Sequence, residues 1–324
     1  MKNVDRKVYF IGDFVSEVDA KVSIYDSSLM FGDMVFEMTR SFNKKHFKLH
    51  DHIDRLYIGL KILRIKINMS KEEMYNACIK TATVNEHLFN QDDEHRLMID
   101  VSRGLLSIYE NIEKLHKGPN IIIADFPLKW TVAGMDLLFD EGINAVITPQ
   151  RVIPPDLMDP KIKNRSRLFY LMANIQASEV KGKNNWALLL DVDGFIAEGS
   201  GTNFLMIKDG KVISPEGRNM LRGISRQYVI DFLCPKLGIP FIEKNIEPYD
   251  VYNADEAFMT GTPFCLLPVT KLNGLDIGDG KVGPVYKKLL EAWGSENKVD
   301  IKSQIKNWNK NLSNEISISP YKFK

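Results

Sequence analysis

Two Asp-Gly pairs constrain the fold of this chain more than any other feature of its sequence. Asp193-Gly194 and Asp209-Gly210 each lie between short apolar segments. Asp-Gly is a preferred two-residue hairpin turn, because both turn positions need a positive φ angle. The region from 188 to 215 is therefore predicted to form two successive hairpins of antiparallel strands.

Helices are expected between further strand-like segments. Apolar residues recur at helical spacing after Asp51, the expected N-cap, and other helices are expected over 71–84 and about 165–180. Further strand-like runs lie at 7–26, 34–42, 97–102, 120–127 and 144–152. Because strands dominate both halves and the helices are interleaved irregularly, the predicted fold class is α+β, or mixed α/β.

The length favours two domains. A chain of 324 residues exceeds one average domain and is short for three. We predict a small N-terminal domain over 1–127, a linker over 128–135 and a larger C-terminal domain over 136–324. Residues after about 297 are rich in Lys, Asn and Ser, and they are expected to form a peripheral polar tail.

Charge, hydropathy and cysteine content exclude several classes of protein. Lys and Arg number 43 against 42 Asp and Glu, a formal net charge of +1, so a generally basic nucleic-acid-binding protein is disfavoured. No apolar run reaches the roughly 20 residues of a membrane helix, and the N-terminal residues lack a signal-peptide core. Cys78, Cys234 and Cys265 have no disulfide or metal-ligand spacing. We therefore expect buried cysteines in a cytoplasmic protein, without a metal site and with neither nucleic acid nor membrane as partner.

Three charged side chains occupy positions suited to cofactor chemistry. Arg55 lies beside the apolar stripe of a predicted helix, where it can bind a planar anion or pair with Asp51 or Asp54. Lys163 follows a Pro-rich segment and is either a nucleophile or one more solvated lysine. Glu198 precedes a Gly-Ser-Gly turn, and it can bond a protonated ring nitrogen or be an edge-strand charge.

Two turns offer hydroxyls and backbone N–H groups that suit a phosphate. Ser225 lies in the segment GISR, at the expected start of a helix, and Thr260–Pro263 forms the segment TGTP after a strand. Such turns can bind an anion. The alternatives are an ordinary helix cap and a simple turn.

Taken in order, these residues resemble the class-IV pyridoxal-phosphate aminotransferases. That family includes branched-chain aminotransferases, D-amino-acid aminotransferases, R-selective amine transaminases and aminodeoxychorismate lyase. The resemblance runs from about Tyr25 to Trp293, through DSSLMFGDMVFEMTR, FKLHDHIDRL, VSRG, PKIKNRSRL, LRGISRQYVIDF and ADEAFMTGTPFCLLPV, and is most specific between Gly194 and Gly223. It implies a small N-terminal α/β domain, a larger β-barrel-like domain with flanking helices, and a homodimer with the active site at the domain interface.

The resemblance also implies a role for each matching residue around pyridoxal 5′-phosphate. Lys163 matches the lysine that binds the cofactor covalently and later shuttles the proton. Glu198 matches the carboxylate that pairs with the pyridine nitrogen. The phosphate-binding set is matched by Arg55, Ile224, Ser225 and Thr262, and Arg151 matches, more loosely, a basic residue near the cofactor.

Two departures concern the choice of substrate. Leu168 stands where branched-chain enzymes usually have a tyrosine, which weakens that assignment. Residues 105–112 lack the Arg-x-His pair with which D-amino-acid enzymes bind the substrate carboxylate. Arg96 or Arg103 can substitute for that pair.

The expected substrate wall departs from the family as well. Pro263 has no N–H group, so one donor to the substrate carboxylate is lost. Met34 and Met38 stand in a motif where glycine is common, and their flexible thioether chains reshape the pocket. The candidate wall residues are Phe31, Met34, Phe36, Met38 and Arg40. The alternative is that they form the core of the small domain.

The predicted function is transfer of an amino group from an amino acid, with a branched-chain L-amino acid favoured, to a 2-oxo acid such as 2-oxoglutarate. A D-amino-acid or R-amine transaminase, a lyase of the aminodeoxychorismate type and a scaffold without cofactor are the alternatives. Joint retention of Lys163, Glu198, Arg55 and Ser225 argues against the scaffold.

Overall fold

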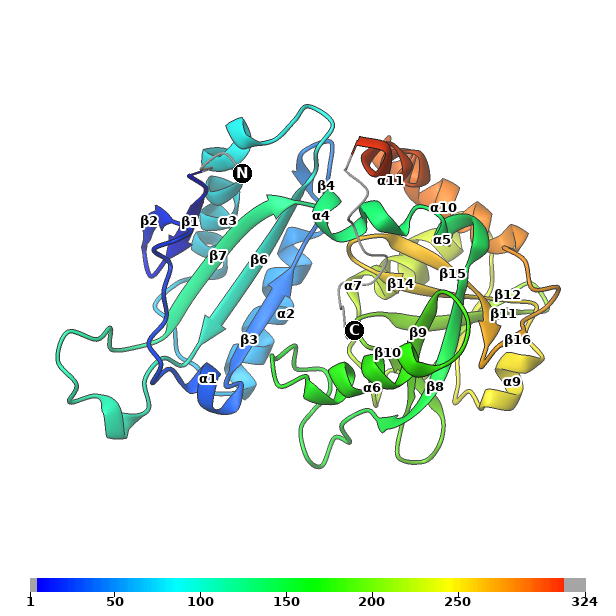
Figure 1. The fold of residues 1–324 in the computed structure, drawn as a ribbon, viewed down its shortest axis with the longest axis horizontal. Coiled ribbons are helices and arrows are strands. Elements are labelled where there is room, and N and C mark those ends of the chain that lie inside the picture. The colour runs from blue at the N-terminus through cyan, green and yellow to red at the C-terminus, as the bar shows by residue number, and fades with distance from the viewer. Residues whose placement is uncertain (1–4, 312–324) are drawn as a thin grey trace. The chain divides into compact units, whose positions relative to one another are not determined.

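The computed structural model describes residues 5–311, and the chain divides into two compact units (Figure 1). The first unit is Met1–Leu128 together with Ile162–Arg167, and the second is Lys129–Lys161 with Leu168–Lys324. Each unit has a sheet and a core of its own. The short segment Ile162–Arg167 belongs with the first unit because its backbone bonds to a strand of that unit.

The first unit is an antiparallel sheet with two helices on one face (Figure 1). The strand order is β2-β1-β7-β6-β3. The strands are β1 (Lys7–Phe10), β2 (Asp13–Ser16), β3 (Met34–Met38), β6 (His95–Ser102) and β7 (Asn120–Pro127). The covering helices are α2 (Leu49–Ile62) and α3 (Lys71–Asn85). Helix α2 begins after Lys48 rather than at Asp51, which lies in its first turn.

Short elements complete the first unit. They are α1 (Ser27–Phe31), the hairpin β4 (Ser41–Phe42) and β5 (Lys45–His46), and the 3-10 turns Glu86–Leu88 and Ser107–Tyr109. Apolar side chains of β3 and β6 form the core with helix α2, among them Val35, Leu97, Ile53 and Leu56. Because side chains alternate along a strand, the other face of β3 is turned away from this core.

The second unit contains a nine-stranded sheet that closes on itself. The strand order is β10-β9-β8-β15-β14-β11-β12-β13, and β10 also pairs with β11. The strands are β8 (Ile143–Arg151), β9 (Asn185–Leu190), β10 (Ile196–Gly199), β11 (Asn203–Lys208), β12 (Lys211–Ser214), β13 (Phe241–Glu243), β14 (Glu256–Gly261), β15 (Cys265–Leu272) and β16 (Leu275–Asp276). The extra pairing produces a β-barrel, and the two Asp-Gly hairpins are β9–β10 and β11–β12, as predicted.

Helices surround this barrel. Helix α6 (Leu168–Glu179) packs Ala173 and Ala177 against β8 and β9. The other helical segments are α4 (Lys129–Val132), the 3-10 turn Ala133–Met135, α5 (Leu138–Glu141), α7 (Ile224–Tyr228), the π-helical turn Val229–Leu233, α8 (Cys234–Lys236), α9 (Pro248–Tyr252), α10 (Pro284–Asn297) and α11 (Ile301–Asn311). Most of the segment 128–135, expected as a linker, is therefore helical.

The prediction of a polar tail after about 297 is wrong as far as Asn311. Helix α11 buries Ile301, Ile305 and Trp308, which recur at helical spacing. Asn309 donates a hydrogen bond to the Asp136 carboxylate at 2.8 Å. Three apolar residues in a polar stretch are enough to hold this helix on the second unit. Residues 312–324 lie outside the described part of the chain.

Buried cysteines were predicted, and Cys78, Cys234 and Cys265 are all buried with free thiols. Among residues 5–311, no helix has both the length and the apolar character that crossing a membrane requires.

Candidate active site

Lys163 is held along the edge of strand β3. The backbone N–H of Phe36 donates to the carbonyl of Lys163 at 2.9 Å, and Val35 and Asn164 form a β-bridge. The Lys163 Nζ atom lies 4.9 Å from the centre of the Phe36 ring. Lys163 is therefore positioned by specific contacts and is not one of several interchangeable solvated lysines.

Gly32 allows the segment that carries Lys163 to approach α1 closely. Its φ angle is +68°, and an added Cβ atom would lie 2.2 Å from the Ser166 hydroxyl oxygen. That hydroxyl donates to the carbonyl of Phe31 at 3.0 Å. Any other residue at position 32 would push the segment away.

Arg55 pairs with a buried carboxylate and not with Asp51 or Asp54. Its Nε and Nη2 atoms donate to the two oxygens of Glu37 at 2.6 and 2.9 Å. Glu37 is fully buried on β3, and it also bonds Nδ1 of His52 at 2.7 Å. One carboxylate on the strand therefore anchors two side chains of helix α2.

Neighbouring charges determine the protonation states of Glu37 and His52. Burial alone would raise the pKa of the Glu37 carboxyl, but Arg55 and His52 outweigh burial and hold it well below its usual range. Burial lowers the pKa of His52 despite the attraction of Glu37, and Arg55 and Lys163 lower it further. His52 is therefore a neutral ring that donates Nδ1–H to an ionised Glu37.

Glu198 lies inside the second unit and is not an edge-strand charge. It is 3% exposed, and its strand β10 has neighbours on both sides. The Tyr170 hydroxyl donates to one carboxylate oxygen. The other oxygen accepts from the Leu221 backbone N–H at 3.3 Å and from the Asn203 amide at 3.4 Å. These neutral donors fix the orientation of the carboxylate.

The predicted phosphate-binding turns also lie in the second unit. Helix α7 begins after Gly223, so Ser225 is its second residue and not the ordinary helix cap that was the alternative interpretation. Ser225 is buried, and Ile224 beside it is half-buried. Gly223 is required because an added Cβ atom would lie 2.0 Å from the Asn203 amide oxygen. Thr262 is half-buried in the turn between β14 and β15.

Two further predicted site residues, Arg151 and Pro263, also lie in the second unit. Arg151, at the end of β8, donates to the carbonyls of Thr148 and Pro149 at 3.1 Å and so bonds within its own strand. Pro263 is half-buried beside Thr262 in the turn after β14.

Met34, Phe36 and Met38 share the face of β3 that is turned away from the core cluster. Their neighbours Val35 and Glu37 face helix α2, so alternation places these three on the opposite side. These three therefore lie outside the core cluster that packs on α2, although Phe36 is itself buried. Phe31 is separate from them, because it lies on α1 and is 68% exposed.

Arginines gather on this same face of the sheet. Arg165 lies 3.7 Å from the centre of the Phe36 ring and bonds Asp100 of β6 at 3.0 Å. Arg40 is 1% exposed and lies 3.8 Å from the centre of the Phe42 ring. Of these two arginines, Arg165 is the one that pairs with Asp100.

Arg96 is a buried cation whose hydrogen bonds are incomplete. It is 8% exposed, and its Nε and Nη1 atoms have no hydrogen-bond partner within residues 5–311. Nη2 contacts the sulfur of Met38 at 3.5 Å. Burial lowers its pKa to about 10, and Arg40 and Arg165 contribute to the shift. An anion that accepts hydrogen bonds from these nitrogens would stabilise the buried guanidinium.

Arg103, the other candidate, is already paired. It makes two bonds to Asp33, at 2.5 and 3.0 Å, and one to the carbonyl of Leu63 at 2.8 Å. It therefore stabilises the turn before β3. The unpaired nitrogens single out Arg96 as the anion-binding candidate.

Several functional neighbours were missed from the sequence. Glu37 stands inside the motif DSSLMFGDMVFEMTR, but it was given no role. The pairing of Glu37 and His52 depends on how α2 packs on β3, and the bond from Tyr170 to Glu198 depends on how α6 packs on the barrel. The only sequence signal that could have found Glu37 was the alternation of side chains between the two faces of β3.

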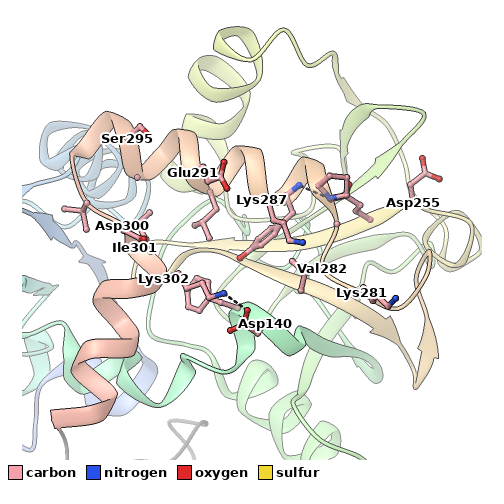
Figure 2. Close-up of a pocket in the computed structure, with 18 of the residues that line it drawn as sticks. Asp140, Asp255, Lys281, Val282, Lys287, Glu291, Ser295, Asp300, Ile301 and Lys302 are labelled. Atoms are coloured by element: carbon pink, nitrogen blue, oxygen red, sulfur yellow. Dashed lines mark hydrogen bonds and ion pairs between the residues drawn. The ribbon is translucent and has the colours of Figure 1, made fainter.

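The second unit also contains a cavity of about 1110 Å³ (Figure 2). It follows helix α10, and no predicted site residue lines it. Two of its carboxylates bond other residues of its wall. Asp140 pairs with Lys302, and Glu256 accepts from the backbone N–H groups of Val285 and Tyr286 at 2.9 and 2.8 Å. We assign this cavity no part in the chemistry.

The family model for amino-transferase class IV matches residues 34–272. A Methanocaldococcus jannaschii protein provisionally named a branched-chain-amino-acid aminotransferase is 37% identical over 288 residues, covering 89% of this chain and 95% of the relative. The branched-chain-amino-acid aminotransferase of Escherichia coli strain K12 is 29% identical, covering 88% of this chain and 91% of that protein. This chain belongs to the class-IV aminotransferase family.

Solved structures agree with the fold. The Escherichia coli branched-chain amino acid aminotransferase superposes with a TM-score of 0.80 at 27% identity, covering 90% of this chain and 94% of that one. The branched-chain aminotransferase of the archaeon Thermoproteus uzoniensis, solved with norvaline, gives 0.76 at 26% identity, covering 93% and 96%. A further branched-chain amino acid aminotransferase, complexed with N-(5′-phosphopyridoxyl)-L-glutamate, gives 0.77 at 26% identity, covering 94% and 96%. The expected mixed α/β fold with a barrel in the larger unit is confirmed.

Proposed function

We propose that this protein is a pyridoxal-phosphate-dependent aminotransferase that moves an amino group between an amino acid and a 2-oxo acid. The proposal rests chiefly on Glu198, a buried carboxylate that three neutral donors orient. Such a group suits a protonated ring nitrogen. Lys163, positioned along β3, is the amine that would hold the cofactor covalently.

The residues present fit the cofactor, which, when bound, supplies an electron-accepting ring. Glu198 would keep the ring nitrogen protonated, because an ionised carboxylate stabilises the cation. Arg55, Ile224, Ser225 and Thr262 are the proposed phosphate-binding set, in which Arg55 is oriented by Glu37. Arg151, whose match to the family is looser, is proposed only as a basic residue of the second unit.

Lys163 has a second proposed role after the substrate has entered. Its Nζ atom would take the proton from the substrate α-carbon and return a proton at the transfer position. The hydrogen bond from Phe36 N–H fixes the backbone of Lys163, so only its side chain needs to move.

Arg96 is the proposed binding residue for a substrate carboxylate. Its buried Nε and Nη1 atoms need an acceptor, and a carboxylate binds a guanidinium with two parallel hydrogen bonds. Met34, Phe36 and Met38 offer an apolar wall on the same face, with Arg40 beside them. Pro263 stays a candidate for the substrate-binding turn, and Phe31 a candidate for the rim of the pocket.

We favour a branched-chain L-amino acid as donor and 2-oxoglutarate as acceptor. The apolar wall suits an aliphatic side chain, and the similar proteins are named for branched-chain amino acids. The test is multiple-turnover transamination with L-leucine, L-isoleucine and L-valine, against D-amino acids and R-amines. K163A is the inactive control. Turnover restricted to D-amino acids or R-amines would replace the L-branched-chain assignment with those alternatives.

We further propose a cytoplasmic homodimer. Ile24, Leu29 and Phe31 in the first unit are apolar and each more than 60% exposed, and a second copy would cover such side chains. Three free buried cysteines suit a reducing compartment. Sedimentation of the purified protein tests the dimer, and a monomer at micromolar concentration would exclude it.

A further inference from the structure

Tyr170 connects helix α6 to the carboxylate of Glu198 inside the second unit. Its hydroxyl donates a hydrogen bond to Oε1 of Glu198. Tyr170 is 7% exposed and Glu198 is 3% exposed, so the bond lies away from bulk water. A hydrogen bond to a buried charged group is worth more than one at the surface, because loss of the partner leaves the charge without compensation.

The ring of Tyr170 belongs to an apolar cluster that fixes its position. That cluster includes Val146 of β8, Leu189 of β9 and Ala197, which precedes Glu198 on β10. The ring of Phe169 lies beside it, with 4.0 Å between the two ring centres. Because packing holds the ring, the hydroxyl approaches Glu198 from one fixed direction.

Two further donors to Glu198 make longer hydrogen bonds. The Leu221 backbone N–H and the Asn203 amide donate to Oε2 at 3.3 and 3.4 Å. An N–H···O bond is usually roughly 2.7–3.2 Å long. The Asn203 amide also donates to the Leu221 carbonyl, at 2.8 Å. Of these three donors, the hydroxyl of Tyr170 is therefore the one that stabilises the carboxylate most.

This phenol does not stand at the position where branched-chain enzymes usually have a tyrosine. That position is Leu168 here, the first residue of α6, and it is 69% exposed. Residues two apart on a helix point about 200° away from each other. A side chain at 168 therefore cannot replace Tyr170 against the barrel, and the contact with Glu198 is a feature of position 170 itself.

We propose that Tyr170 is a positioning residue whose hydroxyl keeps Glu198 ionised, so that Glu198 holds a proton on the cofactor ring nitrogen. A carboxylate that accepts a hydrogen bond is stabilised in its charged form. Without this donor, the proton between the ring nitrogen and Glu198 moves toward the carboxylate, which leaves two neutral groups in a buried site. Loss of the ring proton weakens the electron-accepting character on which the proposed chemistry depends. The inference rests on the function proposed above, because it concerns the same carboxylate.

The test is nitrogen-15 NMR of the full-length protein loaded with pyridoxal phosphate labelled at the ring nitrogen, whose resonance separates the protonated from the unprotonated form. The parent should show the protonated position. Y170F keeps the ring but loses the hydroxyl, so its resonance should move toward the unprotonated position, and its single-turnover rate with an amino donor should fall about tenfold. Y170M also lacks the hydroxyl, and it provides the same comparison if Y170F does not fold. A parent-like resonance in the folded variant overturns the proposal.

Y286F is the matched control. Tyr286 is 1% exposed in the same unit, and its hydroxyl donates to the carbonyl of Leu266 at 3.2 Å. Y286F therefore also loses a buried hydrogen bond, but it should keep the resonance of the parent. A shift as large as that of Y170F would show a general packing effect and overturn the role of Tyr170.

E198Q separates this inference from the proposed function. Its ring nitrogen should be unprotonated, because the amide cannot stabilise the cation. A parent that binds no labelled cofactor, or an E198Q variant whose nitrogen stays protonated, would contradict the role proposed for Glu198 and that of Tyr170 with it. An unprotonated nitrogen in E198Q together with a parent-like resonance in Y170F would contradict the role of Tyr170 alone.

Discussion

The guanidinium of Arg55 forms two hydrogen bonds, of 2.6 and 2.9 Å, with the fully buried carboxylate of Glu37. This pair joins helix α2 to strand β3 inside the first unit. Without Glu37, the side chain of Arg55, which we propose binds the cofactor phosphate, could adopt several rotamers. Glu37 therefore acts as a positioning residue for Arg55, and His52 supports it from the other side.

E37Q should destabilise the protein and weaken cofactor binding. The change leaves Arg55 without its buried carboxylate, and breaking a buried ion pair costs roughly 3–5 kcal/mol of unfolding free energy. Urea unfolding measures the first effect, and fluorescence titration with pyridoxal phosphate under folding conditions measures the second. E72Q, at an exposed position on α3, is the control. Parent-like affinity in folded E37Q would remove the positioning role.

E198Q should keep the cofactor but slow its reaction. The neutral amide cannot hold a proton on the ring nitrogen, so the rate of α-proton removal should fall about 100-fold or more. The measurement is the single-turnover half-reaction with the preferred amino acid, followed by stopped-flow absorbance. Half-reaction rates equal to the parent would take Glu198 out of this role.

R96Q should raise the KM for the carboxylate substrate that Arg96 binds. Loss of charged hydrogen bonds worth roughly 1.5–3 kcal/mol corresponds to about 10- to 100-fold, with a smaller effect on kcat if the contact is present before the chemical step. R64Q removes an arginine from an exposed position in the same unit and should leave both constants unchanged. A parent-like KM for donor and acceptor in R96Q would exclude this assignment.

His46 should make the protein less stable as the pH falls below about 6.5. Burial lowers its pKa to about 3, and the neighbouring His95 and His52 act in the same direction. Its Nε2 atom has no hydrogen-bond partner among residues 5–311. Between these two pKa values the unfolded chain binds a proton that the folded chain does not, so the unfolding free energy falls by at most about 1.4 kcal/mol per pH unit.

H46Q removes that penalty. Its unfolding free energy should fall less steeply than that of the parent between pH 6.5 and 4.5, as measured by urea unfolding at each pH. H87Q, which changes an exposed histidine, should keep the slope of the parent. Identical slopes for H46Q and the parent would show that His46 is protonated readily in the folded protein.

Local sequence signals predicted the hairpins well, because an Asp-Gly turn needs no distant partner. The apolar periodicity of α2 was equally visible, although its first turn begins earlier than Asp51 suggested. Helix α11 was missed because only Ile301, Ile305 and Trp308 interrupt a polar stretch. Their burial depends on the surface of the second unit, which the sequence of the helix does not contain.

In the candidate site, too, some residues could be predicted from local sequence and others depend on distant partners. Lys163 and Glu198 could be chosen by motif, since both stand in specific sequence blocks. The partner of Arg55 could not, because the nearby Asp51 and Asp54 are equally plausible until β3 brings Glu37 against α2. The unpaired nitrogens of Arg96 likewise become apparent only when the neighbouring side chains are placed.

The most direct test is an absorbance spectrum of the purified protein with pyridoxal phosphate, before and after amino donors are added. We predict a visible band for cofactor bound to Lys163, which bleaches on addition of L-leucine, L-isoleucine or L-valine and is absent in K163A. A parent protein that forms no such band, or a K163A variant that forms it unchanged, would contradict the account at its centre.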